Sequence, residues 1–336
     1  HTHILMGHGS GGEMMQSLIR ELFLPHFGQP FPEGTADSAV LPVSSLLPVF
    51  TTDSYVVDPV IFPGGNIGQM AICGTVNDLA VTGAKAKFIS TGFILEEGLP
   101  VSTLREIVIS MAEEAKKAGV MIITGDTKVV EKGKADKIFI NTTGIGYMEK
   151  KYVHIHRGRN VNPGDLIVIN GYIGDHSIAV LSARESLNFS SPAVSDCASL
   201  GDMIGGVLEN SDGIHWMRDV TRGGLATVIC ELADTKDYGI NLFETDIPVR
   251  VPVKSACDML GYDPLYLANE GKVVMVIDRE DKDKIMRILK TYPAGTNPAI
   301  IGEVTDIHPG EVVLHTRIGG SRLVHPLAGE QLPRIC

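Results

Sequence analysis

Along the first half of the chain, apolar residues recur at strand spacing in some segments and at helical spacing in others. Residues 49–57 predict a strand, and Asn66 can then cap a helix to about residue 81, because apolar residues recur there at helical spacing. A second strand over 86–95 and a second helix over 101–118 follow. The apolar stripe of that helix comprises Leu104, Ile107, Val108, Met111, Ala112 and Ala115. Strands and helices therefore alternate.

The second half continues in the same way. Further strands are predicted at 120–124, 138–147, 166–170, 240–243 and 272–277 and near Ile300 and Val312, with helices at 175–187, 221–233 and 279–291. This order favours an α/β or α+β fold, with mixed sheets covered by helices. The turn at 160–165 places a domain boundary near residue 155, giving domains over 1–155 and 156–325. Proline and glycine after residue 325 predict a flexible tail over 326–336.

The composition indicates two domains and argues against nucleic acid and membranes as binding partners. The 336 residues, 44% of them hydrophobic, exceed what one core usually serves. The 29 basic and 40 acidic residues give a net charge of -11, which disfavours nucleic-acid binding. No stretch approaches the ~20 apolar residues of a membrane span, and residues 1–12 lack the pattern of a signal peptide. We therefore expect a soluble, cytoplasmic protein without nucleic-acid or membrane partners.

The chain ends on a cysteine. The other four cysteines lie in apolar or helical stretches without zinc-type spacing and are expected to be buried, at positions 73, 197, 230 and 257. Cys336 has no neighbouring base or helix N-terminus, so it is a poor self-activated nucleophile. It is not at a prenylation position. A thiol on a flexible tip can instead receive a group at one site and deliver it to another.

Three aspartates next to turns or on a helix face could hold a nucleotide through a metal ion. They are Asp53, Asp78 and Asp126. Mg²⁺ is typically bound by one or two carboxylates together with phosphate oxygens and water. Asp78 is the most suggestive, because it shares a helix face with apolar residues, where an unpaired charge is costly. For each aspartate alone, a turn or capping role explains the sequence equally well.

Other polar residues could contact phosphate or move protons. The glycine-rich run from His8 to Gly12 could form an anion nest, but it matches neither a P-loop nor a dinucleotide motif, and a mobile loop is the alternative. Lys128 and Arg222 could neutralise negative charge, although both are also explained as surface residues. Glu270 could be a general base if its pKa is raised, or an exposed turn residue, and His8 could also transfer protons.

Six motifs together give a family resemblance. They are His8-Gly-Ser-Gly-Gly12, Phe62-Pro-Gly-Gly-Asn66, Gly74-Thr-Val-Asn-Asp78, Gly125-Asp-Thr-Lys128, Ala268-Asn-Glu-Gly-Lys272 and the terminal Pro333-Arg-Ile-Cys336. The chain resembles the HypE family of hydrogenase expression/formation proteins over essentially its whole length. That family is part of the PurM-like superfamily of aminoimidazole ribonucleotide synthetase and selenophosphate synthetase. The tail that ends in cysteine is its specific feature.

The resemblance implies a fold, a reaction and partners. It implies a two-domain PurM-like fold that binds ATP with Mg²⁺ and forms a homodimer through the first domain. A HypF-type carbamoyltransferase would load a carbamoyl group on the Cys336 sulfur. ATP would phosphorylate the amide oxygen, and loss of phosphate and of the nitrogen protons would leave a thiocyanate. The thiocyanate would supply the cyanide ligands of [NiFe]-hydrogenase iron, with a HypC–HypD-type scaffold complex as the iron-carrying partner.

The resemblance also implies roles for residues. Asp53, Asp78 and Asp126 would bind metal and nucleotide, with Gly64, Gly65, Asn66 and Arg222 near the nucleotide. Lys128, Glu270 and His8 would orient or deprotonate the carbamoyl nitrogen, and the choice of base between Glu270 and His8 stays open. The chain departs from the family at Ser177, where glycine is common, which weakens a phosphate-binding role for that turn. The alternatives are another ATP-using member of the superfamily, of the small-molecule kinase or selenophosphate synthetase type, and a non-catalytic carrier of a cysteine-bound group.

Overall fold

The protein is described here from a computed structural model. The described residues are 12–18, 39–40, 46–185, 193–234, 236–329, 332, 334 and 335. His8 and Cys336, both predicted to take part in the chemistry, lie outside them.

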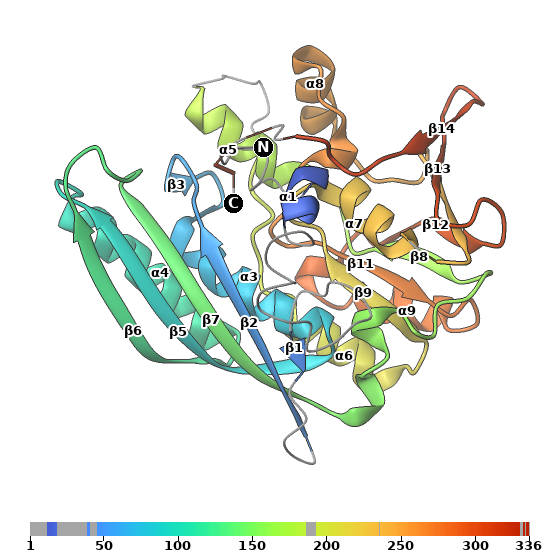
Figure 1. The fold of residues 1–336 in the computed structure, drawn as a ribbon, viewed down its shortest axis with the longest axis horizontal. Coiled ribbons are helices and arrows are strands. Elements are labelled where there is room, and N and C mark those ends of the chain that lie inside the picture. The colour runs from blue at the N-terminus through green and yellow to red at the C-terminus, as the bar shows by residue number, and fades with distance from the viewer. Residues whose placement is uncertain are drawn as a thin grey trace.

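The first domain is built on a five-stranded sheet. Its order is β1 (Ala39–Val40), β2 (Leu47–Tyr55), β7 (Ile138–Met148), β5 (Ala84–Glu96) and β6 (Met121–Val130). Neighbouring strands are antiparallel except β5 and β6, which are parallel. Helices α3 (Ile67–Val81) and α4 (Val101–Lys117) cover one face of this sheet (Figure 1). A two-stranded hairpin, β3 (Ile61–Phe62) and β4 (Gly65–Asn66), leads into α3.

The second domain contains a seven-stranded mixed sheet. Its order is β14 (Ser321–Val324), β13 (Val312–His315), β10 (Gly239–Phe243), β12 (Ala299–Thr305), β8 (Leu166–Ile169), β11 (Val273–Ile277) and β9 (Ile214–Asp219). The helices of this half are α5 (Asp175–Arg184), α6 (Gly201–Asn210), α7 (Gly224–Ala233), α8 (Val251–Leu260) and α9 (Lys282–Leu289). Near the N-terminus, α1 (Glu13–Leu18) lies against this half of the molecule (Figure 1). Short 3₁₀ turns span Lys150–Tyr152, Ile155–Arg157, Pro264–Tyr266 and Pro293–Gly295.

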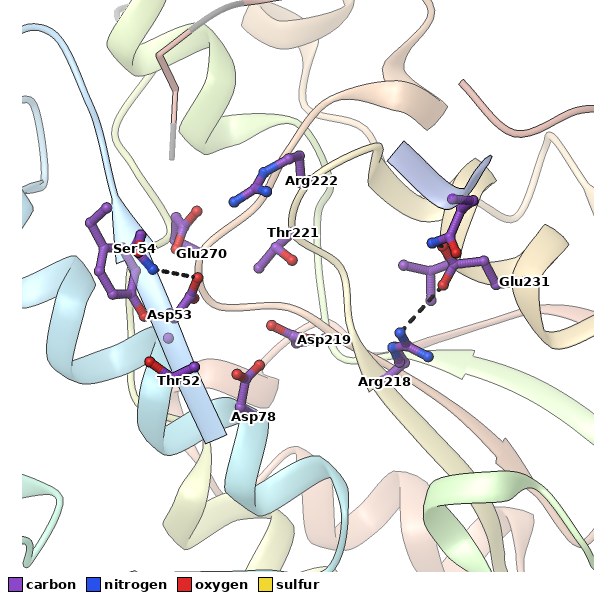
Figure 2. A pocket seen from close by; sticks show the side chains of 14 residues that line it. Thr52, Asp53, Ser54, Asp78, Arg218, Asp219, Thr221, Arg222, Glu231 and Glu270 are labelled. Carbon is purple, nitrogen blue, oxygen red and sulfur yellow. Dashed lines mark hydrogen bonds and ion pairs between the residues drawn. The ribbon is translucent and has the colours of Figure 1, made fainter. Parts of the chain in front are cut away.

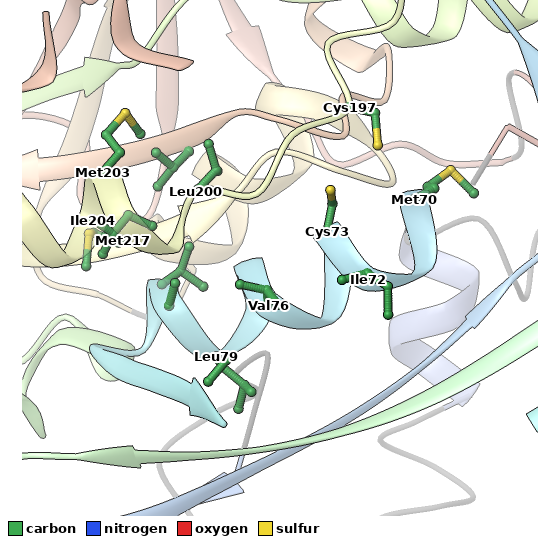
Figure 3. Packing of buried hydrophobic residues seen from close by; sticks show 14 of the residues in the cluster. Met70, Ile72, Cys73, Val76, Leu79, Cys197, Leu200, Met203, Ile204 and Met217 are labelled. Atoms are coloured by element: carbon green, nitrogen blue, oxygen red, sulfur yellow. The ribbon is translucent and has the colours of Figure 1, made fainter. Parts of the chain in front are cut away.

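Helix α3 joins the two domains. It begins where Asn66 caps it, because the Asn66 Oδ1 accepts hydrogen bonds from the backbone N–H groups of Gly68 at 2.9 Å and Gln69 at 3.1 Å. One side of the helix packs on the first sheet, and the other packs on residues from 197 to 217 (Figure 3). The helix is consequently buried on nearly all sides, which fixes the position of every side chain it carries.

The mixed α/β architecture predicted from the sequence is confirmed, with differences in detail. In α4, Val108 is 45% exposed and Glu114 is buried, so the predicted stripe was partly wrong. Strand β6 continues past Thr124 to Val130, so Asp126 lies in the middle of a strand and not at its end. The elements that the sequence pattern did not predict include α1, α6, α8, β9 and β14. None of the described helices combines the length and apolar character that crossing a membrane requires.

Candidate active site at the domain junction

A pocket lies where the two domains meet, and both contribute to its walls. It is lined by Gln16, Thr52, Asp53, Ser54, Tyr55, Gly74, Asp78, Arg218, Asp219, Thr221, Arg222, Val228, Glu231 and Glu270 (Figure 2). The first domain supplies β2 and α3, and the second supplies the end of β9, the start of α7 and the turn before β11. Residues far apart in the sequence therefore share one opening.

Four acidic side chains gather in this pocket. They are Asp53, Asp78, Asp219 and Glu270, whereas a fifth acidic residue of the lining, Glu231, lies apart from them beside Arg218 (Figure 2). Asp78 accepts a hydrogen bond from Thr51 Oγ1 at 2.7 Å, and the Asp53 carboxylate accepts one from the backbone N–H of Ser54 at 2.9 Å. Burial, and after it the negative charges of Asp53 and Asp78, raise the pKa of Tyr55 well above its ordinary value. Such a pocket favours a cation or a cationic group.

Glu270 is the most unusual of the four. It is only 3% exposed, and its Oε1 has no hydrogen-bond partner among the described residues. Burial, followed by neighbouring groups that include Asp196 and Asp53, raises the pKa of Glu270 well above its ordinary value. A buried carboxyl group that keeps one oxygen unpartnered is costly, and such groups are concentrated at functional sites.

Side chains from both domains form hydrogen bonds with the backbone around Glu270. The Asp196 carboxylate accepts hydrogen bonds from the N–H groups of Glu270 at 3.1 Å and Gly271 at 3.2 Å, and it pairs with Lys272 at 2.8 Å. From α3, Asn77 donates to the carbonyl oxygens of Ala198 at 3.1 Å and Glu270 at 3.4 Å. Asn77 also accepts from the N–H of Leu200 at 2.7 Å. The first domain thereby fixes the position of a carboxylate in the second.

Gly74 makes room for one wall of the pocket. A Cβ at this position would overlap the hydroxyl oxygen of Tyr55, which lies 3.4 Å from Thr75 Oγ1. The motif from Gly74 to Asp78 thus has distinct parts, since its glycine admits Tyr55, its Asn77 holds the Glu270 segment and its Asp78 faces the pocket.

The turn before α7 brings three residues into the pocket. Asp219 ends β9, and Thr221 and Arg222 follow after Val220. Gly223 and Gly224 then adopt φ values of +81° and +65°, which let the chain turn into the helix. Arg222 therefore presents its guanidinium beside a helix N-terminus, an arrangement suited to phosphate.

Several predicted residues do not line this pocket. Asp126 and Lys128 are exposed on β6, at the far edge of the first sheet. Gly64, Gly65 and Asn66 form the hairpin and the cap of α3, and the carbonyl oxygen of Pro63 accepts a hydrogen bond from the N–H of Ser195 at 2.8 Å. This hairpin supports the segment that leads to Asp196.

Some residues of the pocket were not singled out from the sequence. Asp219 is one, because the strand that carries it was missed. Arg218 pairs with Glu231 at 3.3 Å, and Gln16 donates to the same carboxylate at 3.0 Å, so α1 closes one side. Asp219 could have been found from its position, because it ends the run of residues 214–219 just before the turn that contains Arg222.

The pocket suits magnesium bound together with phosphate. Among the described residues, no three acidic, histidine or cysteine side chains are arranged to hold a metal by themselves. Mg²⁺ needs only one or two carboxylates when phosphate oxygens and water complete its shell. Asp53 and Asp78 meet that need from two elements of one domain, and Asp219 faces the same space. The donor set therefore fits this ion.

Comparison with known proteins identifies the family. The chain matches the family models for the AIR synthase related protein, N-terminal domain over residues 35–148 and C-terminal domain over residues 162–315. It is 45% identical over 338 residues to the carbamoyl dehydratase HypE of Rhodobacter capsulatus, which covers 99% of this chain and 98% of that protein. The chain belongs to the carbamoyl dehydratase HypE family.

Solved HypE structures share the fold closely. The HypE chain in a HypE–HypF complex is 46% identical with a TM-score of 0.86, covering 93% of this chain and 100% of that one. A hydrogenase maturation protein HypE in complex with ATP is 44% identical with a TM-score of 0.83, covering 99% and 100%. The two-domain PurM-like fold expected from the motifs is thereby confirmed.

Proposed function

We propose that this protein uses ATP to dehydrate an S-carbamoyl group carried by its own Cys336, giving a thiocyanate. Membership of the carbamoyl dehydratase HypE family supports the reaction class. The alternatives, a small-molecule kinase or selenophosphate synthetase and a carrier without catalysis, are not favoured, because the full-length relatives are named as dehydratases. The product would supply cyanide ligands for the iron of a [NiFe]-hydrogenase.

The reaction requires a leaving group and a base. The carbamoyl oxygen leaves as phosphate after it has received the γ-phosphoryl group of ATP, and the carbon–nitrogen bond becomes triple as both N–H protons are lost. The products are thiocyanate, ADP, phosphate and a proton. Each proton on nitrogen needs an acceptor as the carbon–oxygen bond breaks, which is a task for a positioned carboxylate.

The observation that carries the proposal is the state of Glu270. Its carboxyl group is buried in a pocket at the domain junction, with one oxygen unpartnered among the described residues and with a raised pKa. A base whose pKa lies nearer the working pH transfers protons more effectively than an ordinary carboxylate. We therefore assign proton removal from the carbamoyl nitrogen to Glu270, in preference to His8.

The nucleotide would occupy the same pocket. The solved complex of a HypE with ATP supports ATP binding by this protein. Asp53 and Asp78 would hold Mg²⁺, which, when bound, neutralises charge on the phosphates and on the departing oxygen. Arg222 would bind phosphate beside the N-terminus of α7.

The exposed edge of the first sheet supports the proposed homodimer. Every residue of β6 except Val130 is exposed. Exposed apolar side chains gather here and on the uncovered face of the sheet, at Phe50, Ile94, Met121, Ile122, Ile123 and Val129. Edge strands and apolar patches of this kind are usually covered by a partner. A second copy would cover them and bring Asp126 and Lys128 into an interface, so we propose that these two residues complete the pocket of the partner subunit.

Two further partners belong to the proposal. The solved HypE–HypF complex supports a HypF-type carbamoyltransferase as the enzyme that loads Cys336. A HypC–HypD-type iron-carrying complex as acceptor of the cyanide group, and a cytoplasmic location, stay predictions from the sequence.

Substitution of the terminal cysteine tests the proposal. We expect Cys336→Ala to abolish thiocyanate formation while ATP binding, measured by calorimetry, is unchanged. Cys257→Ala is the matched control, because it removes a buried thiol of α8, 1% exposed, and leaves the C-terminal cysteine in place. Dehydration of a free carbamoyl compound by the Cys336→Ala protein, at the rate of the unsubstituted protein, would favour a small-molecule enzyme instead.

A further inference from the structure

The last described residues of the chain are docked beside α5. Ile335 is 3% exposed and belongs to the main hydrophobic core, and the C-terminal end lies next to α5 in Figure 1. The carbonyl oxygen of Arg334 accepts hydrogen bonds from the N–H of Asp58, at 3.2 Å, and from the guanidinium of Arg184. The Arg334 side chain pairs with Asp136 at 2.9 Å. These residues of the tail therefore occupy a defined binding position on the protein.

One histidine holds the peptide bond that precedes the terminal cysteine. His176 Nε2 lies 2.9 Å from the carbonyl oxygen of Ile335, and the ring is fully buried. A carbonyl oxygen only accepts hydrogen bonds, so Nε2 must carry the proton. This carbonyl group belongs to the peptide bond shared with Cys336, so His176 restrains the point from which the last residue extends.

The orientation of the ring is fixed by its other contacts. Nδ1 lies 2.8 Å from Ser195 Oγ, which also accepts a hydrogen bond from the N–H of Cys197 at 3.1 Å. Because Nε2 carries the proton of the neutral ring, Nδ1 accepts from the Ser195 hydroxyl. Burial lowers the pKa of His176, which favours the neutral ring, and the carbonyl oxygen of Ile335 selects the tautomer. Phe62 packs edge-on against the ring, with centroids 5.3 Å apart.

The same segment connects this ring to the proposed base. Ser195 is followed directly by Asp196, whose carboxylate binds the N–H groups of Glu270 and Gly271. Two adjacent residues thus hold the tail-binding ring and the Glu270 backbone in a fixed relation. The turn containing His176 was considered from the sequence as a phosphate loop, and here it contacts the tail.

We propose that His176 is a positioning residue for dehydration, which presents the cysteine-bearing end of the tail to the Glu270 pocket through its hydrogen bond to the Ile335 carbonyl. The inference rests on the proposed function only in taking the tail as the carrier of the substrate. Loading by a separate carbamoyltransferase needs the tail to be accessible, so this hydrogen bond should assist dehydration and should not assist loading.

A pair of amide substitutions separates this role from a structural one. In His176→Gln the amide nitrogen can reach the position of Nε2, whereas in His176→Asn it reaches only the position of Nδ1. Loss of one neutral hydrogen bond shifts an equilibrium by about fivefold. We expect iodoacetamide to alkylate Cys336 about fivefold faster in the Asn variant than in the unsubstituted protein, measured by mass spectrometry of the C-terminal peptide without ATP. The Gln variant should resemble the unsubstituted protein.

Turnover provides the second readout. Single-turnover thiocyanate formation from carbamoylated protein should be slower in the Asn variant and restored in the Gln variant, with carbamoylation by the transferase not slowed in either. His156→Asn is the matched control, because His156 is a buried histidine of the turn Ile155–Arg157 and accepts a hydrogen bond from Arg157. This substitution should change neither rate.

Equal alkylation and turnover rates in the Asn and Gln variants would overturn the assignment, as would a Gln variant more impaired than the Asn variant. If the unsubstituted protein formed no thiocyanate, the proposed function would fail, and the alkylation rates alone would still decide whether His176 holds the tail.

Discussion

Replacing Glu270 by glutamine tests two effects of this residue, its role in proton removal and the loss of stability caused by burying its carboxylate. The amide keeps the size of the side chain but cannot remove a proton from the carbamoyl nitrogen. General-base catalysis typically contributes about 10²–10⁴ in rate, equivalent to about 3–5 kcal/mol of activation free energy. We therefore expect single-turnover thiocyanate formation to fall by about 10²–10⁴, with ATP binding retained.

The stability of this variant should change in the opposite direction. Glu270 has a folded pKa raised above the ordinary value of 4.5, so between these values the folded state binds a proton that the unfolded state has lost. The contribution of this proton to stability is therefore lost as pH rises through that window. Glu270→Gln should unfold at higher denaturant concentration than the unsubstituted protein at neutral pH, with a smaller difference near pH 4.5.

The same pKa sets the pH dependence of turnover, because only the ionised carboxylate accepts a proton. The rate should rise with pH through the raised pKa of Glu270 in the unsubstituted protein and lose that dependence in the Gln variant. A Gln variant with near-normal turnover, or one that is less stable at neutral pH, would refute the assignment of Glu270 as a buried base.

Three other predictions follow from the pocket and the sheet edge. Asp78→Asn should weaken Mg-ATP binding in calorimetry, and unchanged affinity would remove Asp78 from the metal site. Gly74→Ala should destabilise the protein by about 1–3 kcal/mol in urea unfolding, because its Cβ overlaps the Tyr55 hydroxyl. Mixing inactive Lys128→Ala and Glu270→Gln subunits should restore part of the activity if Lys128 serves the partner's pocket, since each mixed dimer then keeps one intact site. No recovery in demonstrably mixed dimers would contradict that arrangement.

Periodicity predicted the elements that carry most of the site, because local signals were strong there. The Asn66 cap and the apolar repeat after it located α3, and the structure confirms both the cap and the end at Val81. That prediction placed Asp78 on the apolar face of the helix, and the structure shows that the helix is buried on nearly all sides. Glu270 was a candidate base from its place at a strand edge, although the local pattern alone favoured an exposed turn residue, which was wrong. Its burial depends on Asp196 and Asn77, which lie far from it in the sequence.

The misses have physical causes as well. Strand β9 has buried and half-buried side chains without a clean alternation, so no period of two indicated it and Asp219 was not recognised. Asp126 and Lys128 looked like residues of a turn after a short strand, yet β6 continues through them because it pairs in parallel with β5. Long-range pairing of this kind leaves little trace in local sequence.

Mass spectrometry of the C-terminal peptide tests the central claim most directly. Protein carbamoylated at Cys336 is incubated with Mg-ATP, and the mass of the peptide is followed in time. The account predicts loss of the mass of one water molecule from the carbamoylated peptide, with ADP and phosphate formed in equal amounts and neither change in the Glu270→Gln protein. Retention of the full carbamoyl mass by folded protein that binds ATP would contradict it.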